Sequence, residues 1–124
     1  MNPVVVRAGA GWTRVCGAGE LLDGGDGVRF EVADDQGSAA AFAVRSQGVV
    51  RAYLNRCRHV PVELDWSPGK FFDETGLYLI CATHGATYRA SDGACAGGPC
   101  RGGLVALPVR EADDEVLVEL RTQD

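Results

Sequence analysis

The sequence contains no long apolar run, no cluster of basic residues and only two histidines. Its longest uninterrupted apolar stretch, Ala39 to Val44, has six residues, whereas a helix needs roughly 20 to cross a bilayer. The N-terminus has no charged leader ahead of a long apolar stretch, so no signal peptide is predicted. We therefore expect no membrane span and a cytoplasmic protein.

Positive charge is scarce as well. The 12 Lys and Arg residues face 17 Asp and Glu residues, which gives a formal net charge of -5. Because phosphate binding requires clustered Lys and Arg, this balance argues against a nucleic acid partner.

The length of 124 residues matches a single domain with a real core. Glycine is the one unusual residue, because 17 glycines are about twice the usual share of roughly 7%. Frequent glycine indicates many tight turns, as an all-β domain with functional loops would use them.

Short β-type runs bounded by turn residues recur along the chain, whereas helical periodicity is hard to find. Val28, Phe30 and Val32 alternate with Arg29 and Glu31, which gives one apolar and one polar face. This pattern is typical of an all-β, antiparallel sandwich or small barrel.

Two β-type runs, Ala41 to Ser46 and Val49 to Asn55, are separated only by Gln47 and Gly48. This spacing predicts a tight hairpin in which the glycine supplies a positive φ. The second strand of the hairpin leads directly to Cys57.

A compact apolar strand over Tyr78 to Ile80 leads in the same way to Cys81. A later strand is predicted where Val105, Leu107 and Val109 alternate with other residues. Cys57 and Cys81 are therefore expected just past strand ends.

Both histidines follow a cysteine at close range. The first pair is Cys57-Arg58-His59, and the second, after 21 intervening residues, is Cys81-Ala82-Thr83-His84, followed by Gly85. Two thiolates and two imidazoles suit iron–sulfur chemistry or zinc.

The spacing separates these options. A C-x-H step is too short to wrap comfortably around one tetrahedral zinc, for which spacings of two to four residues are usual. Two irons relieve the difficulty if each pair divides its ligands between them, as in a centre with Cys₂ on one iron and His₂ on the other. A structural zinc site, a Cys-His nucleophile pair and metal-free buried pairs remain the alternatives.

The two motifs resemble the cluster-binding loops of the Rieske [2Fe-2S] family. The likeness continues through Tyr88, Asp92-Gly93 and Gly97-Gly98-Pro99, and it covers at least residues 53 to 109. It implies one Rieske domain over residues 1–124, with a cluster-binding subdomain at about 56–89 inserted in a base β domain. It also implies one [2Fe-2S] cluster per chain, whose ligands and close neighbours would be Cys57, His59, Cys81 and His84, with Gly85, Tyr88 and Pro99 around them.

The loop after the second histidine indicates the branch of the family. High-potential members resemble C-x-C-H-G-S-x-Y, in which the serine and tyrosine hydroxyls bind cluster sulfurs. This chain keeps Tyr88, has Ala86 in place of the serine, and has Thr83 and Val60 to Val62 where those members place a cysteine pair. The resemblance therefore implies a low-potential type without the cross-loop disulfide.

Three cysteines are not used by this ligand set. Cys95 and Cys100 flank a Gly-Gly-Pro turn and are close enough in sequence for a disulfide, although small packing thiols are expected in a reducing compartment. Cys16, near an early strand, is expected in the core.

The resemblance implies an electron carrier, with the outer histidines as the electron exit. A stand-alone ferredoxin would pass single electrons from a reductase to an oxygenase or other acceptor, and its acidity fits docking on a basic partner. A complete oxygenase is excluded because its mononuclear iron needs two further histidines. An accessory subunit of a larger reductase, of the nitrite-reductase type, or a redox-sensing module is the alternative. No catalytic residue and no organic substrate are predicted.

Overall fold

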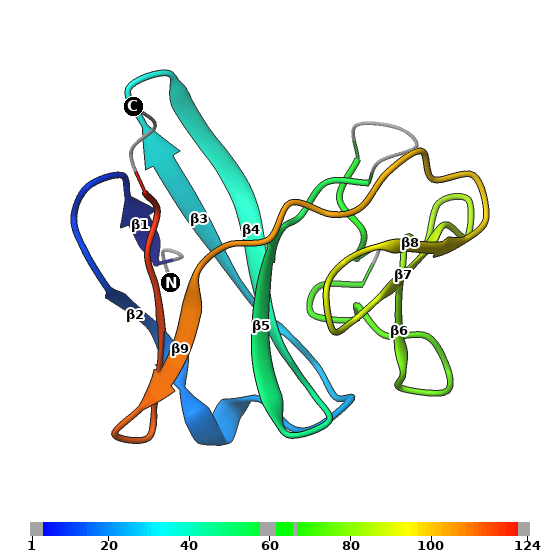
Figure 1. Ribbon diagram of the computed structural model, residues 1–124, viewed down its shortest axis with the longest axis horizontal. Coiled ribbons are helices and arrows are strands. Elements are labelled where there is room, and N and C mark those ends of the chain that lie inside the picture. The colour runs from blue at the N-terminus through cyan, green and yellow to red at the C-terminus, as the bar shows by residue number, and fades with distance from the viewer. Residues whose placement is uncertain (1–3, 58–61, 66, 122–124) are drawn as a thin grey trace.

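The computed structural model describes residues 4–57, 62–65 and 67–121. The described chain contains ten strands and one 3-10 turn (Figure 1). In chain order these are β1 Val5–Arg7, β2 Thr13–Gly17, η1 Ala18–Glu20, β3 Val28–Asp34, β4 Gly37–Ser46, β5 Val49–Leu54, β6 Tyr78–Ile80, β7 Thr87–Arg89, β8 Cys95–Gly97, β9 Val109–Ala112 and β10 Glu115–Val118. The predicted all-β class is confirmed, and all strand pairs are antiparallel except β1 with β3.

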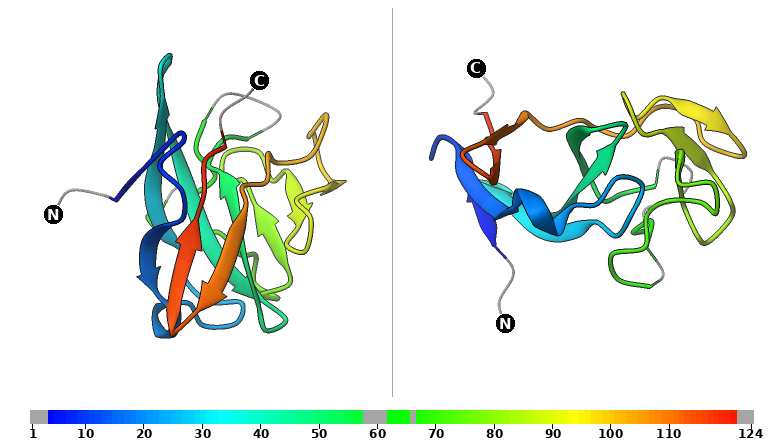
Figure 2. Two further views of the ribbon diagram at one scale, coloured as in Figure 1. Left: turned by 60° about the vertical axis from the view of Figure 1, so that its left-hand side comes forward. Right: turned by 90° about the horizontal axis from the view of Figure 1, so that it is seen from below.

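Two sheets form the larger half of the molecule. One has the strand order β1-β3-β4-β5 and the other β2-β10-β9, and they enclose the first hydrophobic core (Figure 2). Phe30, Val32 and Val116 lie in this core, and so does Cys16, as its position near an early strand predicted.

The third sheet, β6-β7-β8, lies on the other side of β5 in the smaller half of the molecule (Figure 1). A second hydrophobic core fills the space between this sheet and the hairpin of β4 and β5. Within it the rings of Phe42 and Phe71 stack with their centroids 4.0 Å apart. The small sheet is thus attached to the larger half by buried aromatic contacts.

Strand β4 serves both cores because its side chains alternate between two faces. Ala41 and Ala43 lie in the first core, whereas Phe42 and Val44 lie in the second. Both faces of the strand are buried, which explains the continuous apolar run in this part of the sequence.

The hairpin predicted before Cys57 is confirmed. Ser46 pairs with Val49, and the two turn residues Gln47 and Gly48 both have a positive φ, 52° and 80°. Such a turn matches the natural twist of the flanking strands, so β5 leaves the hairpin in a fixed register toward the first cysteine.

The strand predicted over Val105 to Val109 is wrong in its first part. β9 begins only at Val109, and the preceding residues follow β5 through separate hydrogen bonds, including one from Leu107 N to Ala52 O of 2.9 Å. Pro108 interrupts the run because it has no amide hydrogen for a ladder.

No helix in the described part of the chain is long and apolar enough to span a membrane. The division into one domain with an inserted subdomain at 56–89 stays a prediction. The small sheet itself continues past that boundary to Gly97.

We expect Phe71→Ala to lower the free energy of unfolding by about 3–5 kcal/mol, because it leaves a cavity at the centre of the second core. Urea unfolding measures the change. The control is Leu77→Ala, whose side chain is 55% exposed and should change stability by no more than about 0.5 kcal/mol. Equal effects of the two substitutions would contradict the role given to the stacked rings.

Candidate metal centre

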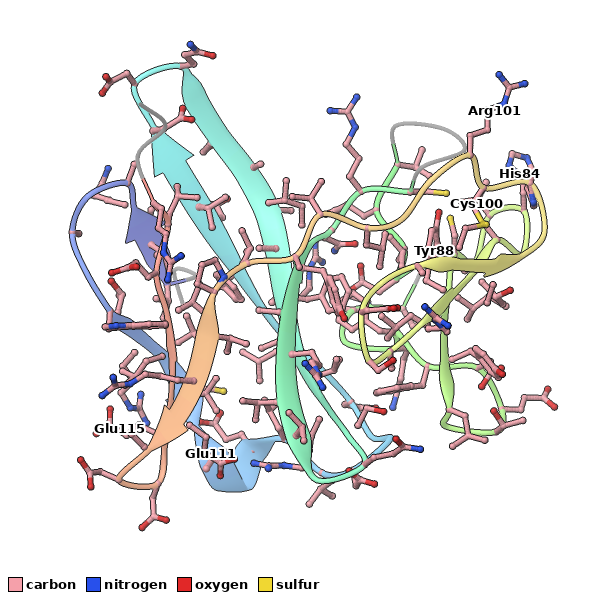
Figure 3. The ribbon with its side chains drawn as sticks, viewed as in Figure 1. His84, Tyr88, Cys100, Arg101, Glu111 and Glu115 are labelled. Atoms are coloured by element: carbon pink, nitrogen blue, oxygen red, sulfur yellow. A yellow bond between two sulfur atoms is a disulfide. The ribbon has the colours of Figure 1, made fainter. Side chains whose placement is uncertain are left out.

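The two cysteines predicted as ligands lie at one end of the molecule, each shortly after a strand. Cys57 follows β5 and Cys81 directly follows β6, and both are buried, with 3% and 0% of their surface exposed. His84 lies on an exposed loop at this same end (Figure 3). His59 lies outside the described residues, so its position stays a prediction.

Each cysteine closes its own loop through the same backbone hydrogen bond. The Cys57 amide donates to the carbonyl of Val62, and the Cys81 amide donates to the carbonyl of Ala86, both at 2.8 Å. Each bond therefore joins a cysteine to the residue five positions later. Gly85 tightens the second loop, because its amide donates to the Cys81 carbonyl at 2.9 Å and its φ of 78° favours glycine.

The two loops are also joined to each other. The Ala82 amide, in the second loop, donates to the carbonyl of Leu64, just beyond the first, at 3.1 Å. This bond fixes the second loop relative to the segment that ends the first one.

That segment is held by a buried polar pair that the sequence analysis missed. Asn55 donates from Nδ2 to Asp65 Oδ1 at 2.9 Å and accepts at Oδ1 from the Leu64 amide at 2.8 Å. The Gly69 amide donates to Asp65 Oδ2 at 2.9 Å, and Arg29 Nε lies 3.5 Å from the same oxygen. A polar residue directly after a buried strand was the only available signal in the sequence.

The two buried cysteine thiols lie in contact with each other. Burial raises the pKa of the Cys81 thiol above its ordinary value; hydrogen bonding from Thr83 offsets part of this rise, and the neighbouring Cys57 thiol adds to it. Thiolates are the form in which cysteines bind a metal, and coordination removes the thiol proton outright. Two adjacent sulfur donors are therefore a donor pair that fits a thiolate-bound metal group.

Tyr88 supplies a hydroxyl at this pair. It lies on β7, its side chain is fully buried, and its Oη is 3.6 Å from Cys57 Sγ. The neighbouring position 86 is a buried alanine, which has no hydroxyl to donate. The described geometry thus brings the Tyr88 hydroxyl to Cys57, while the Thr83 side chain hydrogen-bonds Cys81.

A third loop, residues 97–101, packs against the second one. A Cβ atom at Gly98 would lie 2.9 Å from the Gly85 carbonyl oxygen and 3.0 Å from Ala86 Cα. Only a residue without a side chain allows the two backbones to approach this closely. Pro99 follows at an exposed position.

The expectation that Cys95 and Cys100 are small packing thiols is wrong. The structure joins them in a disulfide, with their Cα atoms 6.0 Å apart. The turn between them brings the two ends of the third loop together. The bridge closes that loop and does not link it to either ligand loop.

No group of three or more His, Cys, Asp and Glu side chains in the described ranges, which omit His59, is gathered as a site for a metal ion. Of the predicted residues, the structure brings together Cys57, Cys81, Gly85 and Tyr88. His84 lies on the second cysteine loop.

Comparison with known protein families supports the resemblance inferred from the two Cys/His motifs. The family model described as "Rieske [2Fe-2S] domain" matches residues 11–109. A search of curated proteins finds no match.

Solved structures with similar folds include ferredoxins. One similar chain belongs to the reduced complex between oxygenase and ferredoxin in carbazole 1,9a-dioxygenase, at 25% identity and a TM-score of 0.72; the match covers 91% of this chain but only 29% of that one. The fold also matches the Sphingomonas yanoikuyae B1 ferredoxin, at 23% identity and a TM-score of 0.67, over 87% of this chain and 97% of the ferredoxin. A chain in a complex of reduced oxygenase and oxidized ferredoxin gives 24% identity and a TM-score of 0.70, over 91% and 96%.

We expect Asn55→Ala to lower the free energy of unfolding by about 2–4 kcal/mol, because it leaves the Leu64 amide and an Asp65 oxygen buried without these partners. Denaturant unfolding measures the loss, and the iron content of the purified protein should fall with it. Gln36→Ala, at an exposed turn between β3 and β4, is the control and should change neither. An Asn55 variant as stable as the control would show that the buried pair does not hold the loop.

Proposed function

Because the chain belongs to the Rieske [2Fe-2S] domain family, whose members carry one [2Fe-2S] cluster, we propose that it is an electron carrier of the ferredoxin type. The proposed cluster ligands are Cys57, His59, Cys81 and His84. Bound in this way, the cluster accepts and releases one electron at a time. The carrier would take electrons from a reductase and deliver them to an oxygenase or another acceptor, in the cytoplasm.

The observation that carries this proposal is the pair of matching loops. Each is closed by a hydrogen bond from its cysteine amide to the carbonyl five residues later, and each has a histidine two or three residues after the cysteine. The two cysteine side chains interact in a buried position. This arrangement supports two ligands on each loop that face a shared group.

The exposure of the two ligand types supports the direction of electron transfer. Both cysteines are buried, whereas His84 is exposed at the end of the molecule (Figure 3). An electron leaving through the imidazole would cross the shortest protein layer. We therefore infer that the histidine side is the electron exit.

Two observations support a carrier over the larger enzyme. The fold similarity extends over 97% of the Sphingomonas yanoikuyae B1 ferredoxin, but over only 29% of the first chain compared. In addition, both histidines of the chain are assigned to the cluster, so none remains for a mononuclear iron site.

The segment after the second histidine supports a low potential. Hydrogen bonds to sulfur stabilise the reduced, more negative cluster and so raise the midpoint. From the segment after the second histidine, Tyr88 can supply such a bond and Ala86 cannot. We propose a midpoint in the lower half of the range of about -150 to +300 mV, in a centre without a cross-loop disulfide.

Metal analysis and electron paramagnetic resonance of the purified protein test the proposed function. We expect iron and acid-labile sulfide in equal amounts, at two irons per chain, and a reduced-state spectrum with the low average g value that nitrogen ligation produces. The same sample gives the midpoint in a redox titration. A colourless protein with one zinc would end the proposal, and a midpoint above about +200 mV would end the low-potential assignment.

We expect Tyr88→Phe to lower the midpoint by about 40 mV, because it removes one hydrogen bond of about 1 kcal/mol that favours the reduced state. A redox titration followed by visible absorption measures the shift. The matched control is Tyr78→Phe, which removes a hydroxyl from an exposed ring on β6 and should leave the midpoint unchanged. No shift in the Tyr88 variant would remove the hydroxyl from the account of the potential.

A further inference from the structure

The net negative charge is not shared by the part of the molecule that contains the ligand loops. Residues 56–104 contain five Lys and Arg and five Asp and Glu residues, whereas the rest of the chain contains seven and twelve. The formal charge of -5 therefore belongs to the larger half. The charge seen by a partner will depend on which end of the molecule it approaches.

Two of the loop segments that form the cluster end contain no acidic residue. None occurs from Ile80 to Ser91, which includes the second ligand loop, or from Gly93 to Arg110, which includes the third loop. Asp92, which separates these two stretches, is paired with Arg89, and Glu63, just after the first ligand loop, is paired with Arg29.

Two arginines at this end are exposed and have no ion pair in the described part of the chain. Arg101 directly follows the disulfide-bonded Cys100, so its backbone is anchored at the loop that packs on Gly85. It lies at the same end of the molecule as His84 (Figure 3). Arg56 directly precedes Cys57. Elsewhere, arginines such as Arg14 and Arg45 are paired with glutamates.

Two acids without an ion pair in the described ranges, Asp113 and Asp114, form the turn between β9 and β10. Glu111 and Glu115, which flank this turn and pair with Arg45 and Arg14, lie opposite the end that bears Arg101 (Figure 3). The net negative charge thus lies in the larger half, whereas the cluster end carries unpaired arginines.

The cluster end also offers the mixture of side chains that protein interfaces use. Exposed apolar surface is supplied by Val62, 38% exposed, and by Pro99. Cations at the edge of such a patch steer a partner and fix its orientation.

We propose that the surface formed by Arg56, His84, Pro99 and Arg101 is the docking site for the redox partner, and that this partner presents an acidic face. The inference rests on the proposed function and identifies the chemistry of its partner. It replaces the expectation from net charge alone, which was a basic partner. The charges close to the docking surface matter most, because exposed charges more than a Debye length from the partner, about 10 Å at 0.1 M salt, are largely screened.

Coated gold electrodes provide a defined planar partner. A carboxylate-terminated monolayer represents an acidic face and an amine-terminated monolayer a basic one. Surface plasmon resonance measures the mass of cluster-loaded protein adsorbed at about 0.1 M salt, and voltammetry on the same surface measures the current from the cluster. We expect a larger current per adsorbed molecule on carboxylate than on amine. On carboxylate the cluster end should face the electrode, whereas on amine the acidic larger half should face it and the cluster should lie further away.

The variants Arg101→Glu and Arg56→Glu should each lower the current and the adsorbed mass on carboxylate by about tenfold. The control, Arg7→Glu, makes the same change in net charge at an exposed residue of β1, in the larger half, and should keep both. A larger current per molecule on amine, or equal losses in all three variants, would overturn the proposal. Failure of the proposed function would appear separately, as protein that adsorbs to carboxylate but contains no iron and sulfide.

Discussion

Two backbone hydrogen bonds, from Cys57 to Val62 and from Cys81 to Ala86, are the constraint on which the site depends. Each bond turns a cysteine amide into the closing point of a short loop, so the thiol is held by main chain and not by side-chain packing alone. A third bond, from Ala82 to Leu64, ties the loops to each other. Because backbone bonds do not depend on side-chain identity, the intervening residues are free to supply the histidines.

This arrangement needs a rigid platform, and β4 and β5 supply it. The alternation of small and large side chains along β4 places Ala41 and Ala43 toward the larger half and Phe42 and Val44 toward the smaller one. Tyr53 on β5 adds to the second core, and its hydroxyl donates to the Ala90 carbonyl at 2.8 Å. The sheet therefore supports the two cysteine loops, and His84 on the second loop is exposed.

The parts of this structure that the sequence predicts well are governed by local chemistry. The hairpin at Gln47 and Gly48 follows from turn preferences, and the placement of Cys57 and Cys81 after strands follows from the apolar runs before them. The Asn55–Asp65 pair and the Cys95–Cys100 disulfide depend on which segments meet in space, and single-sequence patterns do not contain that information. Strand β8 is a further example, because it is recognisable only through its pairing with β7.

The distribution of charge over the surface is likewise not predictable from composition alone. A net charge of -5 describes the chain as a whole, whereas the proposed docking would depend on the few charges within a Debye length of the proposed electron exit. In this proposal Arg101 has the larger effect, because the disulfide and the close approach of Gly98 to Gly85 fix its loop against the second ligand loop.

We propose that one cysteine and one histidine from each loop hold the same two-iron cluster. Because the chain contains only two histidines, pulsed electron paramagnetic resonance of the reduced protein, labelled with ¹⁵N in histidine alone, reports on both proposed histidine ligands. We expect strong hyperfine coupling to two distinct ¹⁵N nuclei, one from each loop. Coupling to one histidine nitrogen, or to none, would contradict this ligand set.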